Sequence, residues 1–255
     1  MGEAKRGKAA GSRVRALAAP GAPGALTKLV VPAGVAPPSA ETALRAVSIA
    51  ETVRTRVRER LLHGAATGRI DRMRAAIDAA CGECVALFED ALRSSLVTNL
   101  EHRVAMDRVA CRRGCAFCCY VDVVVTPLEA IRLAGRARPG GVATAPHRRP
   151  CSLLADGACT VYDRRPFACR SIFSEDARAC EAGYAGVGAA PIPSLAWPRF
   201  LACGYITGQI AAMDDLGLAS HLVELRRALA VMDEDATALW RWLDGADVFP
   251  RQNAP

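Results

Sequence analysis

The cysteines are the residues of this sequence best suited to chemistry. Eleven occur among 255 residues, and eight of them fall between residues 111 and 180. A thiolate is a soft, charged ligand, and four thiolates suit either a Zn²⁺ ion or an iron–sulfur cluster. The candidate metal ligands are Cys111, Cys115, Cys118, Cys119, Cys151, Cys159, Cys169 and Cys180.

The first four candidates form a compact motif, CRRGCAFCC, at residues 111–119. Spacings of two or three residues let one loop deliver several ligands, whereas the other ligands must come from distant segments. Adjacent cysteines usually point in different directions. The pair Cys118 and Cys119 therefore indicates either two centres, or one ligand and one thiol that lies beside the site.

Other uses of cysteine do not account for this group. The N-terminus is basic but no apolar stretch follows, so no secretory signal is visible and a disulfide framework is not expected. Cys81 and Cys84 lie in a strongly helical stretch and Cys203 lies in an apolar run, so we expect these three to pack in the core. His147 is the one histidine near the group, which argues against a mixed Cys/His site.

Arginines flank the candidate ligands. Four thiolates carry more negative charge than one divalent ion neutralises, and guanidinium groups can offset the excess and donate hydrogen bonds to sulfur. The arginines in question are Arg112, Arg113, Arg164, Arg165 and Arg170. Ligand number and arginine density together favour an iron–sulfur cluster slightly over zinc.

The region from residue 111 to residue 169 resembles the YkgJ-type cysteine-cluster family, also described as a CxxCxxCC zinc- or iron-chelating domain. The matching pieces are CRRGCAFCC, a helix that contains Glu129, the isolated Cys151, and CTVYDRRPFACR at residues 159–170. SEDARACEAG at residues 174–183 continues in the style of longer members. One departure is the first spacing, which is three residues where the family has two.

The resemblance implies a metal-binding role for all eight candidate cysteines. It also implies that Tyr162, Arg165 and Arg170 lie around the cofactor and that Pro166 fixes the approach to Cys169. Members look like iron–sulfur or zinc binders, so the expected function is a metal centre with a structural or redox role. One relative with this domain methylates lysines of flagellin, so a cluster-dependent enzyme such as a protein lysine methyltransferase is the alternative.

The elements that must position these cysteines are mostly helices. Apolar spacing predicts a helix from about 39 to 64 and another from about 67 to 110, with a break near residues 81–82. Thr126, Pro127 and Glu129 form a capping box that starts a helix ending around 135–141. The remaining predictions are loop at 142–160, irregular chain at 183–198, and helices at 196–214, 218–232 and 234–243.

These elements predict a mainly α fold, a helical layer around an irregular cysteine-rich metal-binding insert. We expect one domain over residues 41–250, with the cysteine cluster at 111–180, and a disordered basic arm over residues 1–40. Hydrophobic residues make up 51% of the chain and aromatic residues 5%, so the core must be built mainly from aliphatic side chains.

Charge and hydropathy limit the kinds of partner that we expect. The net charge is +7, but residues 1–72 hold 13 Lys and Arg against 5 Asp and Glu, so the rest of the chain is close to neutral. The arm could contact nucleic acid or an acidic partner, yet we do not expect a nucleic-acid partner, because Arg54, Arg56, Arg58 and Arg60 do not share one helix face. The longest uncharged apolar run, 200–213, is shorter than the roughly 18 residues of a membrane span. We expect a cytoplasmic protein without membrane contact, and a protein partner is left open.

Overall fold

The computed structural model describes residues 26, 28–31, 35, 38–136, 149–186 and 194–250. This part of the chain is mainly helical with a few two-residue strands, which confirms the predicted mainly α class. Most of the expected basic arm lies outside the described residues, as do residues 142–148, which begin the expected 142–160 loop and include His147. None of the described helices is long and apolar enough to cross a membrane.

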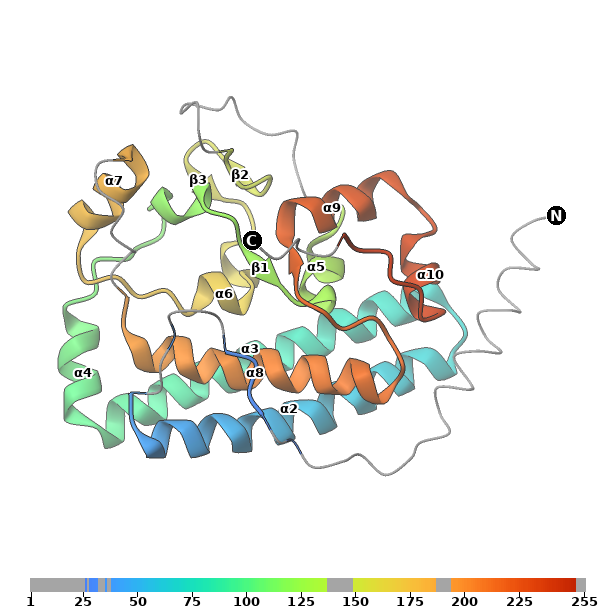
Figure 1. The fold of residues 1–255 in the computed structure, drawn as a ribbon, viewed down its shortest axis with the longest axis horizontal. Helices are drawn as coiled ribbons and strands as arrows, with labels where there is room; N and C mark the ends of the chain where they lie inside the picture. The colour runs from blue at the N-terminus through green and yellow to red at the C-terminus, as the bar shows by residue number, and fades with distance from the viewer. Residues whose placement is uncertain are drawn as a thin grey trace.

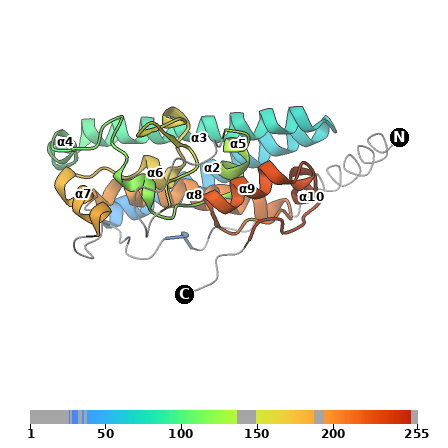
Figure 2. The same ribbon diagram turned by 90° about the horizontal axis from the view of Figure 1, so that it is seen from above.

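Three long helices run side by side: α2 (Ala40–Ala66), α3 (Ile70–Thr98) and α8 (Ala196–Asp215) (Figures 1 and 2). Ser39 caps α2 by accepting a hydrogen bond from the Thr42 N–H, and the helix continues past its expected end at residue 64.

The predicted break near residues 81–82 is wrong, because α3 runs through both residues. One glycine in a helix interior costs only about 1 kcal/mol, which tertiary packing overrides. The helix stops instead before Asn99, whose side chain accepts a hydrogen bond from the His102 N–H and so caps the next helix, α4 (Leu100–Asp107).

Helices α2 and α8 approach closely because α8 carries two glycines at the contact. A Cβ on Gly204 would lie 2.4 Å from the carbonyl oxygen of Ala46, and a Cβ on Gly208 would lie 2.6 Å from that of Ala50. A buried ion pair joins the same two helices, since Arg54 donates to the Asp215 carboxylate at 2.6 and 2.7 Å.

We expect Gly208→Ala to lower the free energy of unfolding by about 2 kcal/mol, within the usual cost of overpacking a core. Urea denaturation measures the change. The control is Gly82→Ala on α3, where the nearest atom, Nη2 of Arg132, lies at 3.8 Å. That variant should gain up to about 1 kcal/mol from helix propensity. A loss of equal size in both variants would contradict the close approach.

The remaining elements are short and lie beside the long helices (Figure 1). In chain order they are η1 (Phe117–Tyr120), β1 (Val124–Val125), α5 (Pro127–Leu133), β2 (Leu154–Ala155), β3 (Ala158–Cys159), η2 (Tyr162–Arg164), α6 (Phe167–Arg170), α7 (Ala177–Ala185), β4 (Val223–Glu224), α9 (Leu225–Glu234) and α10 (Ala238–Leu243). The predicted capping box at α5 is confirmed, although the helix ends earlier than expected.

The C-terminal helices also differ from the prediction at their boundaries. Strand β4 pairs antiparallel with β1, with Val125 opposite Val223. This pairing takes residues that the predicted 218–232 helix included, so α9 begins only at Leu225. The side chain of Glu224 accepts from the first free N–H groups of α9 and fixes that start.

Part of the expected 142–160 loop is a hairpin. Strands β2 and β3 pair antiparallel, with Leu154 opposite Cys159. Asp156 and Gly157 connect them, and both have positive φ, at 50° and 72°. Two central residues with positive φ form the turn that matches the twist of a tight hairpin. The hairpin fixes the position of Cys159 relative to the chain before β2.

An aromatic cluster anchors α6 to the long helices. Phe167 of α6 stacks on Tyr205 of α8 at 4.9 Å between ring centroids and meets Phe88 of α3 edge to face at 5.5 Å. All three rings are almost fully buried. The cluster holds α6, which carries Cys169, against α3 and α8.

Candidate metal centre

The eight candidate ligands lie on segments that the long helices do not include. Cys111 and Cys115 precede η1, which contains Cys118 and Cys119; Cys151 precedes β2 and Cys159 ends β3; Cys169 lies in α6 and Cys180 in α7. All eleven cysteines of the chain are described and all are free thiols. Cys81, Cys84 and Cys203 are buried in the core, as predicted.

Four of the thiols gather around the hairpin, and we call Cys119, Cys151, Cys159 and Cys169 the hairpin thiols. The N–H of Cys151 donates to the carbonyl oxygen of Cys119 at 2.7 Å, which joins the hairpin to η1. Burial raises the pKa of the Cys169 thiol, and the nearby thiols of Cys118, Cys151 and Cys159 raise it further. Segments far apart in the sequence therefore bring their sulfur atoms into one neighbourhood.

The two adjacent thiols at η1 shift each other's pKa. A hydrogen bond between the two thiols lowers the pKa of Cys118 to about 7 and raises the pKa of Cys119. The positive charge of Arg165 also lowers the pKa of Cys118. A thiol with a lowered pKa is deprotonated more readily, and the thiolate is the form that binds a metal.

The other three thiols, which we call the α7 thiols, are Cys111, Cys115 and Cys180. The N–H of Ser174 donates to the Cys111 sulfur at 3.1 Å, and the Cys180 sulfur lies 3.2 Å from the Ser174 hydroxyl. Cys111 is exposed, Cys115 is half-buried and Cys180 is buried. Ser174 thus brings together two thiols that are far apart in the sequence.

No group of three or more His, Cys, Asp or Glu side chains within the described ranges is arranged to hold a metal ion. The donor set still fits a thiolate centre, because its members are free thiols in mutual electrostatic contact.

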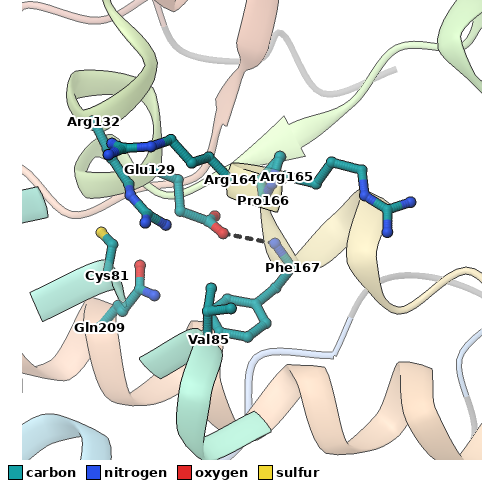
Figure 3. A pocket seen from close by; sticks show the side chains of 9 residues that line it. All are labelled: Cys81, Val85, Glu129, Arg132, Arg164, Arg165, Pro166, Phe167 and Gln209. Carbon is teal, nitrogen blue, oxygen red and sulfur yellow. Dashed lines mark hydrogen bonds between the residues drawn. The ribbon is translucent and has the colours of Figure 1, made fainter. Parts of the chain in front are cut away.

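A buried carboxyl holds the segment that carries Cys169. One oxygen of Glu129 accepts from the Phe167 N–H at 2.7 Å, and the other accepts from the Thr126 N–H at 3.1 Å. Figure 3 shows the Glu129 side chain directed at the start of α6. Burial raises the pKa of Glu129. The space around it has no room for a water molecule, so these residues form a support for α6 and offer no ligand cavity.

Two of the flanking arginines turn toward carboxylates on α3. Arg164 contacts Asp78 at 2.6 Å, and Arg170 contacts Glu89 at 2.9 Å. Arg170 also donates to the carbonyl oxygen of Asp163 and is buried, so it braces the loop between η2 and α6. These pairs tie the cysteine-bearing segment to α3.

Tyr162 and Arg165 stack on each other. The Arg165 guanidinium lies 3.7 Å from the centre of the Tyr162 ring, and Arg113 approaches the same ring at 5.2 Å. The positive charge of Arg165 also acts on a candidate ligand, Cys118.

Two of the four arginines on α2 that could form a nucleic-acid footprint, Arg54 and Arg60, pair with carboxylates of this chain. Arg54 binds Asp215 and Arg60 pairs with Glu83.

An open cleft of about 410 Å³ lies beside the α7 thiols. Aromatic rings and one guanidinium line it, and Cys115 forms part of its wall. Its lining includes Arg112, Cys115, Phe117, Tyr120, Ala177 and Tyr184. Tyr184 of α7 contacts both Phe117 and Tyr120 of η1, at 5.8 and 4.7 Å between ring centroids. The cleft was not expected from the sequence, in which its aromatic residues are scattered.

Comparison of the chain with family models, curated protein sequences and solved structures found no match. The resemblance to the YkgJ-type family therefore remains an expectation carried by the cysteine motifs.

Proposed function

We propose that this chain is a metal-binding protein whose cysteine thiolates hold an iron–sulfur cluster or a zinc ion, with a structural or redox role. The hairpin thiols and Cys118 would be the main ligands, and the metal would supply either a rigid cross-link or an electron-accepting centre. The observation that carries the proposal is the meeting of thiols from three distant segments, with the Cys151 N–H bonded to the Cys119 carbonyl at 2.7 Å.

The surroundings of the thiols support an iron–sulfur cluster over zinc. Arg165 adds positive charge at Cys118, and most of the thiols are half-buried, which limits the access of water to a cluster. The ligands are all sulfur, the donor type that iron–sulfur clusters require and that zinc also accepts. A centre of reduced thiolates also agrees with the cytoplasm, where cysteines stay reduced.

A cluster-dependent enzyme, such as a protein lysine methyltransferase, is the second candidate. The cleft of about 410 Å³ beside Cys115 is the observation that favours it, because a substrate needs a space next to the centre.

The test is metal and acid-labile sulfide analysis of protein purified without oxygen. We expect stoichiometric iron with sulfide in the wild-type protein, or stoichiometric zinc without sulfide if the centre is structural. Cys151→Ser should lower the metal content, while Cys203→Ser, which changes a core thiol on α8, should leave it unchanged. Wild-type protein without bound metal, or equal metal in both variants, would contradict the proposal.

A further inference from the structure

Two thiols that are not among the main ligands proposed above share one contact residue, Ser174. The N–H of Ser174 donates to the Cys111 sulfur at 3.1 Å, and the Cys180 thiol donates to the Ser174 hydroxyl oxygen at 3.2 Å. Ser174 itself is buried. Two cysteines that are far apart in the sequence therefore place their sulfur atoms against two polar groups of a single buried serine.

Further contacts join the two segments that carry these thiols. The Ala110 N–H donates to the Ser174 carbonyl at 2.8 Å, and Arg108 pairs with Glu175 at 2.8 Å. The Ser174 hydroxyl also accepts from the N–H of Asp176, the residue that caps α7, at 3.2 Å. The residues beside Cys111 and those that lead into α7 thus lie against each other along several residues.

The two thiols differ in their access to solvent. Cys111 is exposed, whereas only 7% of the surface of Cys180 is accessible. Thiol–disulfide exchange depends on access to the attacking sulfur. A dissolved reagent therefore reaches Cys111 first, and Cys180 is the neighbouring thiol that can complete an exchange begun there.

Helix α7 has little else that holds it in place. The structure describes all nine residues of α7, and Cys180 is the one that is buried. Figure 1 shows α7 at the edge of the molecule, away from the three long helices. Its residues Ala177 and Tyr184 line the cleft together with Arg112 and Cys115 from the segment that follows Cys111. A covalent link between Cys111 and Cys180 would join two walls of this cleft.

We propose that Cys111 and Cys180 form a reversible disulfide that fixes α7 to the start of the cysteine motif. A disulfide places its sulfur atoms about 2 Å apart, so both sulfurs give up their contacts with Ser174 as the bond forms. The pair leaves the hairpin thiols and Cys118 free to bind metal, so the inference goes beyond the proposed function and does not depend on it.

The oxidant is a small-molecule disulfide such as oxidised glutathione. The Cys111 thiolate attacks one glutathione sulfur, the S–S bond of glutathione breaks, and one glutathione thiolate leaves. The Cys180 thiolate then attacks the Cys111 sulfur, which forms the protein disulfide and releases the second glutathione thiolate. The two cysteines lose their protons to solvent and the two glutathione thiolates take up protons. Two protein thiols are oxidised while one glutathione disulfide is reduced.

The test is peptide mapping of the full-length protein, purified with its metal and without oxygen. The protein is incubated with oxidised glutathione, its free thiols are alkylated under denaturing conditions with a chelator, and it is digested with trypsin for mass spectrometry. Cleavage after Arg112 separates Cys111 from Cys115. We expect residues 109–112 to be linked to residues 179–199, and two alkylated thiols fewer than the eleven of the reduced chain. Dithiothreitol should restore both thiols.

Variants separate this pair from other disulfides. Cys180→Ser should stop at a mixed disulfide between Cys111 and glutathione, and Cys203→Ser, which changes a core thiol, should form the same link as the wild type. A link between residues 109–112 and residues 114–132, which contain Cys115, would overturn the pairing with Cys180. A wild-type protein that carries only glutathione adducts, or no modification, would overturn the disulfide.

Hydrogen exchange tests whether the disulfide fixes α7. Slowly opening segments protect their backbone N–H groups from exchange. We expect the N–H groups of α7 to exchange several-fold more slowly in the oxidised wild type than in the reduced one, and Cys111→Ser to show no slowing after the same treatment. Equal exchange rates in α7 of the oxidised and reduced wild type would contradict a disulfide that holds this helix.

Discussion

Replacing Cys169 by serine is expected to cause a large loss of bound metal. Cys169 lies on α6, which the stacking of Phe167 on Tyr205 fixes in the core. Changes to groups that merely support a ligand lower metal affinity about 10–100-fold, and loss of a ligand should exceed that range. Metal binding supplies folding free energy, so the melting temperature should fall as well. Metal analysis and thermal unfolding measure both effects.

The matched control is Cys84→Ser. Cys84 is a buried thiol of α3, and burial raises its pKa to about 12. A serine there should lower the melting temperature through packing and leave the metal content unchanged. If both variants keep their metal and lose stability equally, Cys169 acts only as a core residue and is no ligand.

Glu129→Ala is expected to lower the free energy of unfolding by about 3 kcal/mol. The substitution leaves the N–H groups of Thr126 and Phe167 without their acceptor, and each unsatisfied buried donor costs about 1–3 kcal/mol. Removing a carboxyl that burial already disfavours returns part of that cost. Urea denaturation of the metal-free protein measures the loss without a contribution from the centre.

Two further variants serve as controls for the effect of Glu129→Ala on stability. Glu129→Gln keeps an oxygen that can accept from the Phe167 N–H, so it should lose less stability than the alanine variant. Glu83→Ala removes a carboxylate that pairs with Arg60 at the surface, a contact worth about 0–1 kcal/mol. A Glu129→Ala variant no less stable than Glu83→Ala would show that the carboxyl does not hold α6.

Helix positions were predictable where local chemistry decides them. Thr126 and Glu129 form a capping box that depends on residues three apart, and the structure has it. A local signal also marked the end of α3, because Asn99 is a strong N-cap for the next helix, α4. The break was instead expected near Gly82, inside α3. The Asp156–Gly157 pair is a common hairpin turn and could have identified β2 and β3.

The tertiary contacts were not predictable in this way. The pairing of β1 with β4 joins segments about a hundred residues apart and delays the start of α9. The role of Ser174 also depends on the path of the chain. The sequence gives no sign that this serine contacts the sulfur atoms of both Cys111 and Cys180. The cysteine motif identified the candidate ligands, and the fold supplied their grouping.

X-ray absorption spectroscopy at the edge of the bound metal tests the central claim most directly, because it reports the atoms around the metal. For protein purified without oxygen, we predict a first shell of sulfur alone, at about 2.3 Å for zinc or for iron in a cluster. An iron–sulfur cluster would add a second shell of iron. A first shell of nitrogen or oxygen atoms would contradict a centre held by cysteine thiolates.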